Sequence, residues 1–290
     1  MSGTLPCRLR RVVMVRTAGA LARSCHPGPT LAVTVLAGLL ALAFDASLAV
    51  GAVVVVAVLS GQLVIGWSND LIDAERDRAD GRSDKPLAGA AVTRAVVIGA
   101  LAAAGLITVA ASLWLGWLPG LIHLVLVVGS GAIYNAGVKA TLWSFVPYAL
   151  AFGSLPAVVW LAASGTPGTA GTQGSPPVWI VIVGALLGVG AHLLNVLPDL
   201  ADDERHGIRG LPHRLGQCRT QLLAPALLTA GTLIVVVAPA GPVRPWGWAV
   251  VVLALVLAAV AARGAGKTPF RAAVALALLS AGSLVANSWS

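Results

Sequence analysis

Nine apolar stretches, each close to the length of a membrane span, dominate this sequence. A helix needs roughly 20 mostly apolar residues to cross the hydrocarbon core of a bilayer. The stretches fall at about 28–44, 47–67, 94–115, 118–135, 142–163, 178–198, 221–240, 246–262 and 271–288. Only 10% of the 290 residues are charged, against about 25% in ordinary soluble domains. The sequence therefore predicts an all-α, polytopic membrane bundle of about nine transmembrane helices around an apolar central cavity.

The positions of Lys and Arg orient this bundle. If the N-terminus is cytoplasmic and nine spans alternate, every Lys and Arg except Arg244 falls on the cytoplasmic side, where such residues gather in membrane proteins. The formal net charge of +8 is therefore a topology signal, and no motif for nucleic acid accompanies it. We expect a cell-membrane protein with a cytoplasmic basic tail over 1–27 and one transmembrane domain over 28–290. Its active-site loops, 68–94 and 195–220, would also be cytoplasmic.

All the acidic residues except Asp45 lie in two stretches, which follow the second and sixth spans. Both stretches contain a row spaced at i, i+4, i+8: Asn69, Asp73 and Asp77, then Asn195, Asp199 and Asp203. Asp70 lies three residues before Asp73, so Asp70, Asp73 and Asp77 form a second set at i, i+3, i+7. Side chains at these spacings lie on one face of a helix. Carboxylates clustered at the ends of spans are costly, so we expect a counter-charge between the two acid rows.

The chemistry that suits these rows is a magnesium–diphosphate site. Mg²⁺ prefers oxygen ligands and is usually held by one or two carboxylates together with phosphate oxygens. Basic residues follow each row: Arg76, Arg78, Arg82 and Lys85, then Arg205, Arg209 and Arg214. Lys139 ends the fourth span beside Tyr134 and Asn135. Arg and Lys together with a metal stabilise a diphosphate leaving group. The residues thus predict such a site at the cytoplasmic mouth of an apolar cavity.

At these residues the sequence resembles the UbiA superfamily of intramembrane prenyltransferases. Asn69-Asp-Leu-Ile-Asp-Ala-Glu-Arg-Asp77 matches the family's Asn-Asp-x-x-Asp-x-x-x-Asp in full, and Arg82-Ser-Asp-Lys-Pro-Leu87 is similar to the basic-Pro-Leu segment that follows. Tyr134 to Lys139 resembles the family's Tyr…Lys element. Asn195-Val-Leu-Pro-Asp-Leu-Ala-Asp-Asp203 and Gly207-Ile-Arg-Gly-Leu-Pro-His-Arg-Leu-Gly216 are similar to the second motif and its tail. The resemblance covers nearly the whole chain.

The resemblance implies an enzyme that transfers an isoprenoid group from an isoprenyl diphosphate to a hydrophobic, aromatic or lipid-like acceptor. Both acid rows would hold Mg²⁺ through the diphosphate, with Asp73, Asp199 and Lys139 as catalytic residues. The groups that bind the diphosphate would be Arg82, Lys85, Lys139 and Arg209. An allylic carbocation would form in the apolar bundle, where Tyr134 and Tyr148 are the candidates for lining the cavity and stabilising the cation. The partners are then donor, acceptor and membrane lipid, without nucleic acid.

Three positions depart from the family pattern. Val196 stands where the second motif usually has its first Asp, and Asp202 is the candidate to replace that acid. His26 precedes the Pro that opens the first span, where many members have Lys or Arg. Gly210 replaces a Thr, a change that we expect to matter little.

Two alternatives to the transferase stay open. One is a membrane terpene cyclase of the same fold, in which no acceptor binds and the cation closes on its own chain. The other is a secondary transporter that couples cations through its acids. Acids at span ends on one face argue against the transporter, whose acids would lie near the middle of the bilayer. The sequence leaves open the donor length, the acceptor and the oligomeric state.

Overall fold

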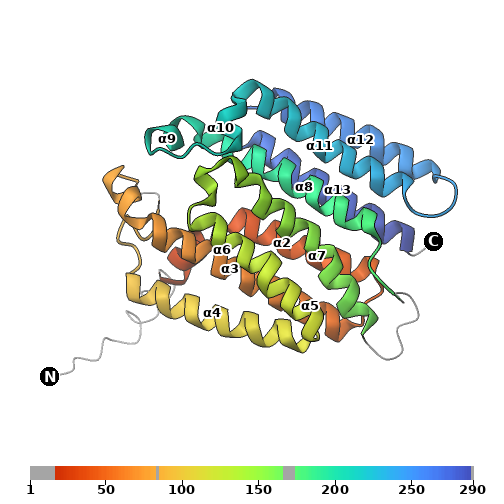
Figure 1. Cartoon of the computed structure of the whole chain (residues 1–290), viewed down its shortest axis with the longest axis horizontal. Coiled ribbons are helices and arrows are strands. Elements are labelled where there is room, and N and C mark those ends of the chain that lie inside the picture. Colours follow the sequence, from red (N-terminus) through yellow and green to blue (C-terminus); the bar gives the residue numbers. More distant parts are fainter. Residues whose placement is uncertain (1–16, 83–84, 166–173, 289–290) are drawn as a thin grey trace.

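The computed structural model describes residues 17–82, 85–165 and 174–288. These residues form a helical bundle without strands (Figure 1). Its main helices are α2 (Pro27–Ala43), α3 (Leu48–Ala79), α4 (Arg94–Trp114), α5 (Trp117–Ile122), α6 (Gly129–Asn135), α7 (Val146–Ser164), α8 (Val178–Val196), α9 (Leu200–Arg205), α10 (Leu211–Leu215), α11 (Gln217–Val237), α12 (Pro245–Arg263) and α13 (Thr268–Ser288). A π-helical segment, His123–Val128, joins α5 to α6, and short 3₁₀ turns cover Val138–Ala140, Leu142–Phe145 and Leu197–Asp199.

The predicted spans are confirmed within a few residues at each end, except that the helix of the second span runs twelve residues further than expected. Among the described residues, eight helices are long and apolar enough to cross a membrane. A ninth span results if helix Thr17–Ser24 and α2, which meet at a bend of 73°, form one crossing. The short first helix lies inside the segment that we expected to be a tail. It is held to α3 because the Trp67 indole donates a hydrogen bond of 3.0 Å to the carbonyl oxygen of Leu21.

Helix α3 is longer than the span predicted at its position. It begins where the Ser47 hydroxyl accepts a hydrogen bond from the amide of Val50, and it runs for 32 residues. At 1.5 Å per residue this is about 48 Å, well beyond the roughly 30 Å of a bilayer core. Residues 68–79 are therefore helical rather than part of a loop, and the first acid row lies on one face of a continuous helix, as its spacing predicts.

The second acid row lies on a broken helix. Helix α8 ends at Val196, and a 3₁₀ turn containing Pro198 leads into α9. Proline lacks the amide hydrogen that continues an α-helix, so the break occurs here. The segment 195–220, expected to be a loop, is therefore largely helical.

The helices close into a ring because each packs against the next and α13 returns to α2. Contact is closest between α7 and α8. An added Cβ at Gly184 would lie 2.2 Å from the carbonyl oxygen of Phe152, and one at Gly188 would lie 2.5 Å from that of Tyr148. Small residues four apart let two membrane helices approach closely. The ring leaves room for a cavity in its centre.

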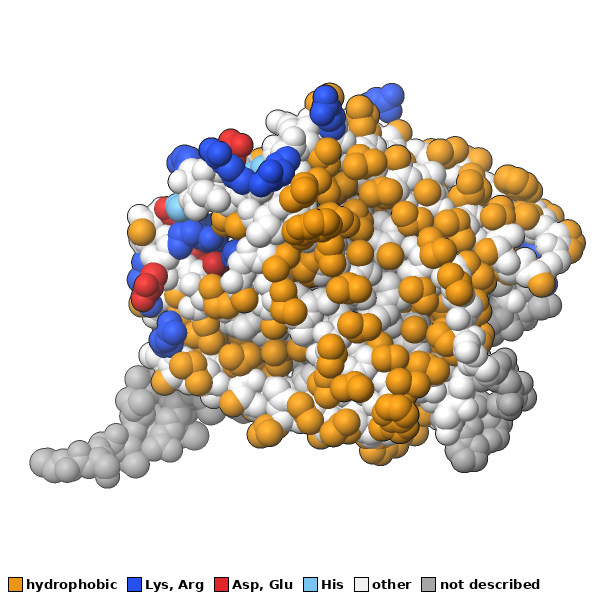
Figure 2. Space-filling model, viewed as in Figure 1, with side chains coloured by type: hydrophobic (Ala, Val, Ile, Leu, Met, Phe, Trp, Pro, Cys, Tyr) orange, Lys and Arg blue, Asp and Glu red, His pale blue; other side chains and the backbone are white. Residues whose placement is uncertain are grey.

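Charged side chains gather at one end of the bundle, which we call the charged end. In Figure 2 they lie over the end that carries α9 and α10, whereas apolar side chains cover most of the visible face. Many large apolar side chains of the described helices are exposed, among them Leu106, Trp117 and Val252. A continuous apolar belt with a charged rim is what a multi-pass membrane protein presents to lipid.

Candidate functional site

A cavity of about 640 Å³ enters the bundle from the charged end. It is lined mainly by α2, α3, α6, α7, α8, α9 and α13, so segments from nearly the whole length of the chain contribute. This is within the range of small-molecule sites, about 300–1,000 Å³. The ring of helices therefore holds one continuous space that is polar near the charged end and apolar farther in.

Most of the site residues that the sequence predicted line this cavity: Asn69, Asp73, Asp77, Arg82, Lys85, Tyr134, Lys139, Tyr148, Asn195, Asp199 and Asp203. The two acid rows are separated by more than a hundred residues in the sequence, yet they face the same space. Asp202, the candidate for the acid missing at Val196, also lines the cavity. Its carboxylate forms an ion pair with Arg205.

Two of the predicted site residues, Asp70 and Arg209, do not line the cavity. Asp70 is 1% exposed, and one of its carboxylate oxygens is buried without a hydrogen-bond partner among the described residues. Consecutive helical residues point about 100° apart, so Asp70 and Asn69 project from α3 in different directions. Arg209 is exposed in the connection between α9 and α10, where its carbonyl accepts a hydrogen bond from Arg214.

Lys139 and Asp73 form the central ion pair of the site. The Lys139 ammonium is 2.9 Å from each carboxylate oxygen of Asp73, across 66 residues of sequence. Arg76 reaches the same carboxylate at 3.0 Å. Both Lys139 and Asp73 are largely removed from solvent, where such charge-assisted contacts are stronger than at an open surface. The pair places a cation directly beside the first acid row.

An aromatic wall borders this ion pair. Tyr134 and Tyr148 meet edge to face with ring centroids 5.2 Å apart, and His192 lies 4.7 Å from Tyr148. Phe152 stacks on the other side of Tyr148, with the ring planes only 8° apart. Aromatic faces attract cations through their quadrupole. The wall thus lies between the charged mouth and the apolar interior, where a developing positive charge would be stabilised.

Gly210 fixes the loop that carries Lys139. An added Cβ at Gly210 would lie 2.6 Å from the Lys139 carbonyl oxygen and 2.8 Å from the Ser144 hydroxyl. That hydroxyl accepts a hydrogen bond from the amide of Leu211 and lies 3.1 Å from the ring of His192. A side chain at position 210 would have to displace this loop. Glycine here is therefore a requirement of the local packing, not the neutral replacement that the sequence suggested.

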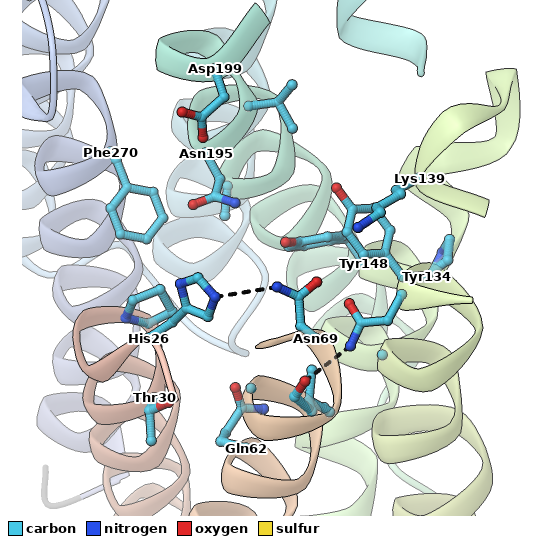
Figure 3. A pocket seen from close by; sticks show the side chains of 18 of the residues that line it. His26, Thr30, Gln62, Asn69, Tyr134, Lys139, Tyr148, Asn195, Asp199 and Phe270 are labelled. Atoms are coloured by element: carbon cyan, nitrogen blue, oxygen red, sulfur yellow. Dashed lines mark hydrogen bonds between the residues drawn. The ribbon is translucent and has the colours of Figure 1, made fainter. Parts of the chain in front are cut away.

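Two polar residues of the cavity, Gln62 and Thr30, carried no motif and were missed by sequence reasoning. Figure 3 shows His26 and Asn69 facing each other across the cavity, with their side chains 3.4 Å apart. Gln62 and Thr30 lie beyond them, on the side away from Asp199. Gln62 is seven residues before Asn69, on the same face of α3, and stands alone in an apolar stretch. A lone amide in a predicted span was the available signal.

His206 bridges the two acidic segments at the mouth of the cavity. Its Nε2 lies 2.9 Å from a carboxylate oxygen of Asp80, at the end of α3, and its Nδ1 lies 2.8 Å from the carbonyl oxygen of Asp202. Both partners can accept hydrogen bonds, and the protonated ring can donate from both of its nitrogens. These two hydrogen bonds, the backbone one first, raise the pKa of His206 above its ordinary value against a smaller opposing effect from Arg76.

Replacing Asp80 with Asn is expected to lower the pKa of His206 toward its ordinary value. Because the pKa is raised in the folded protein, the contact stabilises the fold fully below the ordinary histidine pKa. That contribution is lost as pH rises through the raised pKa. An NMR titration of ¹⁵N-labelled histidine in nanodiscs, wild type against Asp80→Asn, measures the shift. Identical titration curves for the two proteins would show that Asp80 does not hold the ring.

The donor set at the mouth fits Mg²⁺ held together with a phosphate group. Among the described residues, no group of three His, Cys, Asp or Glu is close enough to hold a metal ion alone. The acid rows instead face each other across open space, and a carboxylate oxygen of Asp77 is buried without a hydrogen-bond partner. At this mouth Lys139 and Arg76 are already paired with the Asp73 carboxylate, and a diphosphate would add further negative charge. Asp77 and the other carboxylates of the two rows would hold Mg²⁺ together with a phosphate group, and the metal would neutralise the added charge.

These features define the class of this protein. It is a polytopic helical membrane protein with acidic and basic side chains at the mouth of an apolar cavity. Residues 31–281 match the UbiA prenyltransferase family, so the chain belongs to that family. This confirms the resemblance found in its motifs.

Known relatives agree with this assignment. The chain is 31% identical over 215 residues to the protoheme IX farnesyltransferase of Haloarcula marismortui, a match that covers 69% of this chain and 42% of the relative. The matched region is thus less than half the length of that protein. A UbiA homologue from Aeropyrum pernix superposes with a TM-score of 0.72 at 19% identity, over 90% of this chain and 98% of the other. A UbiA homologue from Archaeoglobus fulgidus, solved with GPP and Mg²⁺, superposes with a TM-score of 0.65 at 16% identity, over 92% and 99%. These superpositions confirm the polytopic helical fold.

Proposed function

We propose that this protein transfers an isoprenoid group from an isoprenyl diphosphate to a hydrophobic acceptor within the membrane, releasing diphosphate. The observation that carries the proposal is the convergence of two acid rows and Lys139 at the mouth of an apolar cavity. Membership of the UbiA prenyltransferase family supports it, as does the homologue solved with GPP and Mg²⁺. The protein would be a Mg²⁺-dependent membrane transferase.

The residues of the mouth divide into two roles. Mg²⁺ would be held through the diphosphate by the carboxylates and amides of the two rows: Asn69, Asp73, Asp77, Asn195, Asp199 and Asp203. Its chemistry is to neutralise charge on the leaving group. Arg82, Lys85 and Lys139 would bind the remaining phosphate oxygens. Lys139 is positioned for this by Asp73 and by the loop that packs on Gly210.

The reaction would take place in two steps beside the aromatic wall. The bond between the allylic carbon and the diphosphate oxygen breaks, and its electron pair leaves with the diphosphate. An electron pair of the acceptor then forms the new bond to that carbon, and the acceptor releases a proton to solvent. Tyr134 and Tyr148 would stabilise the allylic cation from the side. The apolar interior keeps water away from the cation and strengthens the contacts at the mouth.

The orientation of the protein follows from its basic residues. Because Lys and Arg gather at the charged end, we place that end, with the N-terminus and the catalytic segments, on the cytoplasmic side of the cell membrane. The donor would then enter from the cytoplasm. Its diphosphate group would lie at the mouth of the cavity, and its isoprenoid chain would lie among the helices.

Diphosphate release by the purified protein tests the proposal. The protein in nanodiscs is mixed with Mg²⁺ and with each of dimethylallyl, geranyl, farnesyl and geranylgeranyl diphosphate, with and without phenolic and quinone acceptors. We expect release that requires both acceptor and Mg²⁺ and that stops on chelation. Asp73→Asn protein prepared in parallel controls for contaminating phosphatases.

Two other outcomes would replace the proposal. Release without acceptor, together with a cyclic hydrocarbon or terpene alcohol, would identify a membrane terpene cyclase. Absence of release with every donor, together with cation-coupled uptake into liposomes, would identify a transporter. Acids confined to one end of the bundle favour the enzyme over the transporter.

A further inference from the structure

A second, smaller cavity lies directly beyond the inner end of the main one. Its volume is about 30 Å³, and apart from Ser280 its lining is apolar. Both cavities are lined by Leu36, Phe152, Leu187 and Ala277. These four side chains therefore form a wall with open space on both sides, and we call them the inner wall.

The inner wall closes the end of the main cavity that is farthest from the charged mouth. Leu36, Phe152 and Leu187 are the innermost lining residues of the main cavity on α2, α7 and α8, and Ala277 lies at the same depth on α13. From Asn195 to Leu187 the α8 axis rises about 12 Å, at 1.5 Å per residue. The four helices that line the cavity thus run from the mouth to the inner wall, and on α2 the wall residue Leu36 lies six residues beyond Thr30.

The smaller cavity continues the same channel by one helical turn. Its lining includes Leu40, Pro156 and Ala281, each four residues beyond a wall residue on the same helix. One turn is about 5.4 Å, a length comparable to one isoprene unit. The two cavities are therefore one channel between α2, α7, α8 and α13, interrupted only by side chains.

Phe152 is the largest side chain of the wall and is held in place. An added Cβ at Gly188 would lie 2.7 Å from the Phe152 Cβ and 3.0 Å from its Cγ, so the ring occupies the space that a side chain at 188 would fill. On its other side it stacks on Tyr148, with centroids 6.2 Å apart. Packed on two sides, the ring cannot swing away without disturbing α7 against α8.

We propose that the inner wall is the closed end of the isoprenoid-binding part of the cavity and that Phe152 sets the upper limit on donor chain length. This inference rests on the proposed function, because it assumes that the diphosphate lies at the mouth and the isoprenoid chain points inward. A donor whose chain reaches past the wall must fold back or leave part of its apolar surface outside the cavity. For each methylene of the donor that does not fit in the cavity, kcat/KM for that donor falls by about tenfold or more relative to a donor that fits. The wall would therefore discriminate sharply between donors that differ by one isoprene unit.

Variants that move the wall in opposite directions test this proposal. Phe152→Ala joins the two cavities, and Ala277→Leu narrows the inner end. Phe44→Ala is the matched control, because Phe44 is a buried phenylalanine that packs on Trp160 and lines neither cavity. Thermal unfolding in detergent shows that each variant is folded.

Binding and turnover are measured on the same series of donors. Non-reacting thiolodiphosphate analogues of the dimethylallyl, geranyl, farnesyl and geranylgeranyl donors give dissociation constants with Mg²⁺. The natural donors give kcat/KM for diphosphate release. The ratio of interest is kcat/KM for the next longer donor divided by kcat/KM for the best wild-type donor. We expect Phe152→Ala to raise this ratio by about tenfold or more and Ala277→Leu to lower it. Phe44→Ala should leave the ratio unchanged.

The dependence of binding and turnover on donor chain length distinguishes failure of the inner-wall proposal from failure of the proposed function. If wild type binds and turns over donors but Phe152→Ala keeps the wild-type ratios, the inner wall does not set chain length and the proposed function stands. If Ala277→Leu fails to disfavour longer donors, the channel does not receive the chain. If wild type neither binds any analogue nor releases diphosphate, the proposed function fails, and the wall as a limit on donor length fails with it.

Discussion

Replacing Asp73 with Asn is expected to lower the rate of diphosphate release by at least about a hundred- to a thousandfold. Asp73 belongs to the first acid row, and its carboxylate accepts hydrogen bonds from Lys139 at 2.9 Å and lies 3.0 Å from Arg76. The amide keeps the shape but removes the charge that would hold Mg²⁺ and position Lys139. Release is measured as a steady-state rate at saturating donor.

The control for this variant is Asp45→Asn. Asp45 is exposed at the end of α2 away from the cavity and is the one acid outside the two acidic stretches. Its replacement should leave the rate unchanged. Both variants should insert and purify like wild type, because no apolar span is altered. A rate for Asp73→Asn within a few-fold of wild type would remove Asp73 from the catalytic site.

Replacing Gly184 with Ala is expected to produce the largest loss of stability of any single methyl group added to the bundle. The new Cβ would lie 2.2 Å from the carbonyl oxygen of Phe152 and 3.1 Å from the Cα of Gly153. These are backbone atoms, so no side-chain rotation relieves the clash and α7 must move away from α8. Overpacking of this kind costs about 1–3 kcal/mol or more. Chemical unfolding in mixed micelles measures the change.

Gly105→Ala is the matched control for this substitution. Gly105 lies in the middle of α4, and an added Cβ there meets no atom within 4 Å. Alanine favours helix over glycine, so this variant should be as stable as wild type or more so. Equal unfolding curves for Gly184→Ala and wild type would mean that α7 and α8 do not pack as closely as the structure shows.

The acid rows show how far sequence spacing can predict a site. The four-residue steps from Asn69 to Asp77 correctly place these side chains on one face of a helix that points into the cavity. The same reasoning admitted Asp70, because spacings of three and four residues both keep side chains near one face. Only the rotation of α3 within the bundle decides between them, and neighbouring helices set that rotation.

Contacts across the chain were beyond sequence reasoning for a related reason. Asp73 pairs with Lys139 across 66 residues, and Asp80 meets His206 across 126. Periodicity relates residues within one helix and carries no information about which helices become neighbours. The motifs indicated Lys139 by resemblance, but no pattern indicated the Asp80–His206 contact.

The sequence by itself predicted a membrane bundle of about nine spans with two acid rows at one end, and the described residues contain eight or nine such spans. These features are local, because a bilayer demands apolar segments of fixed length and tolerates charge only at their ends. The tertiary structure alone decided which carboxylates face the cavity, how Gly210 fixes the Lys139 loop and that Phe152 lies between the two cavities. These depend on how closely helices approach and how each is rotated. Small residues scattered along the chain, such as Gly184 and Gly188, set that packing jointly.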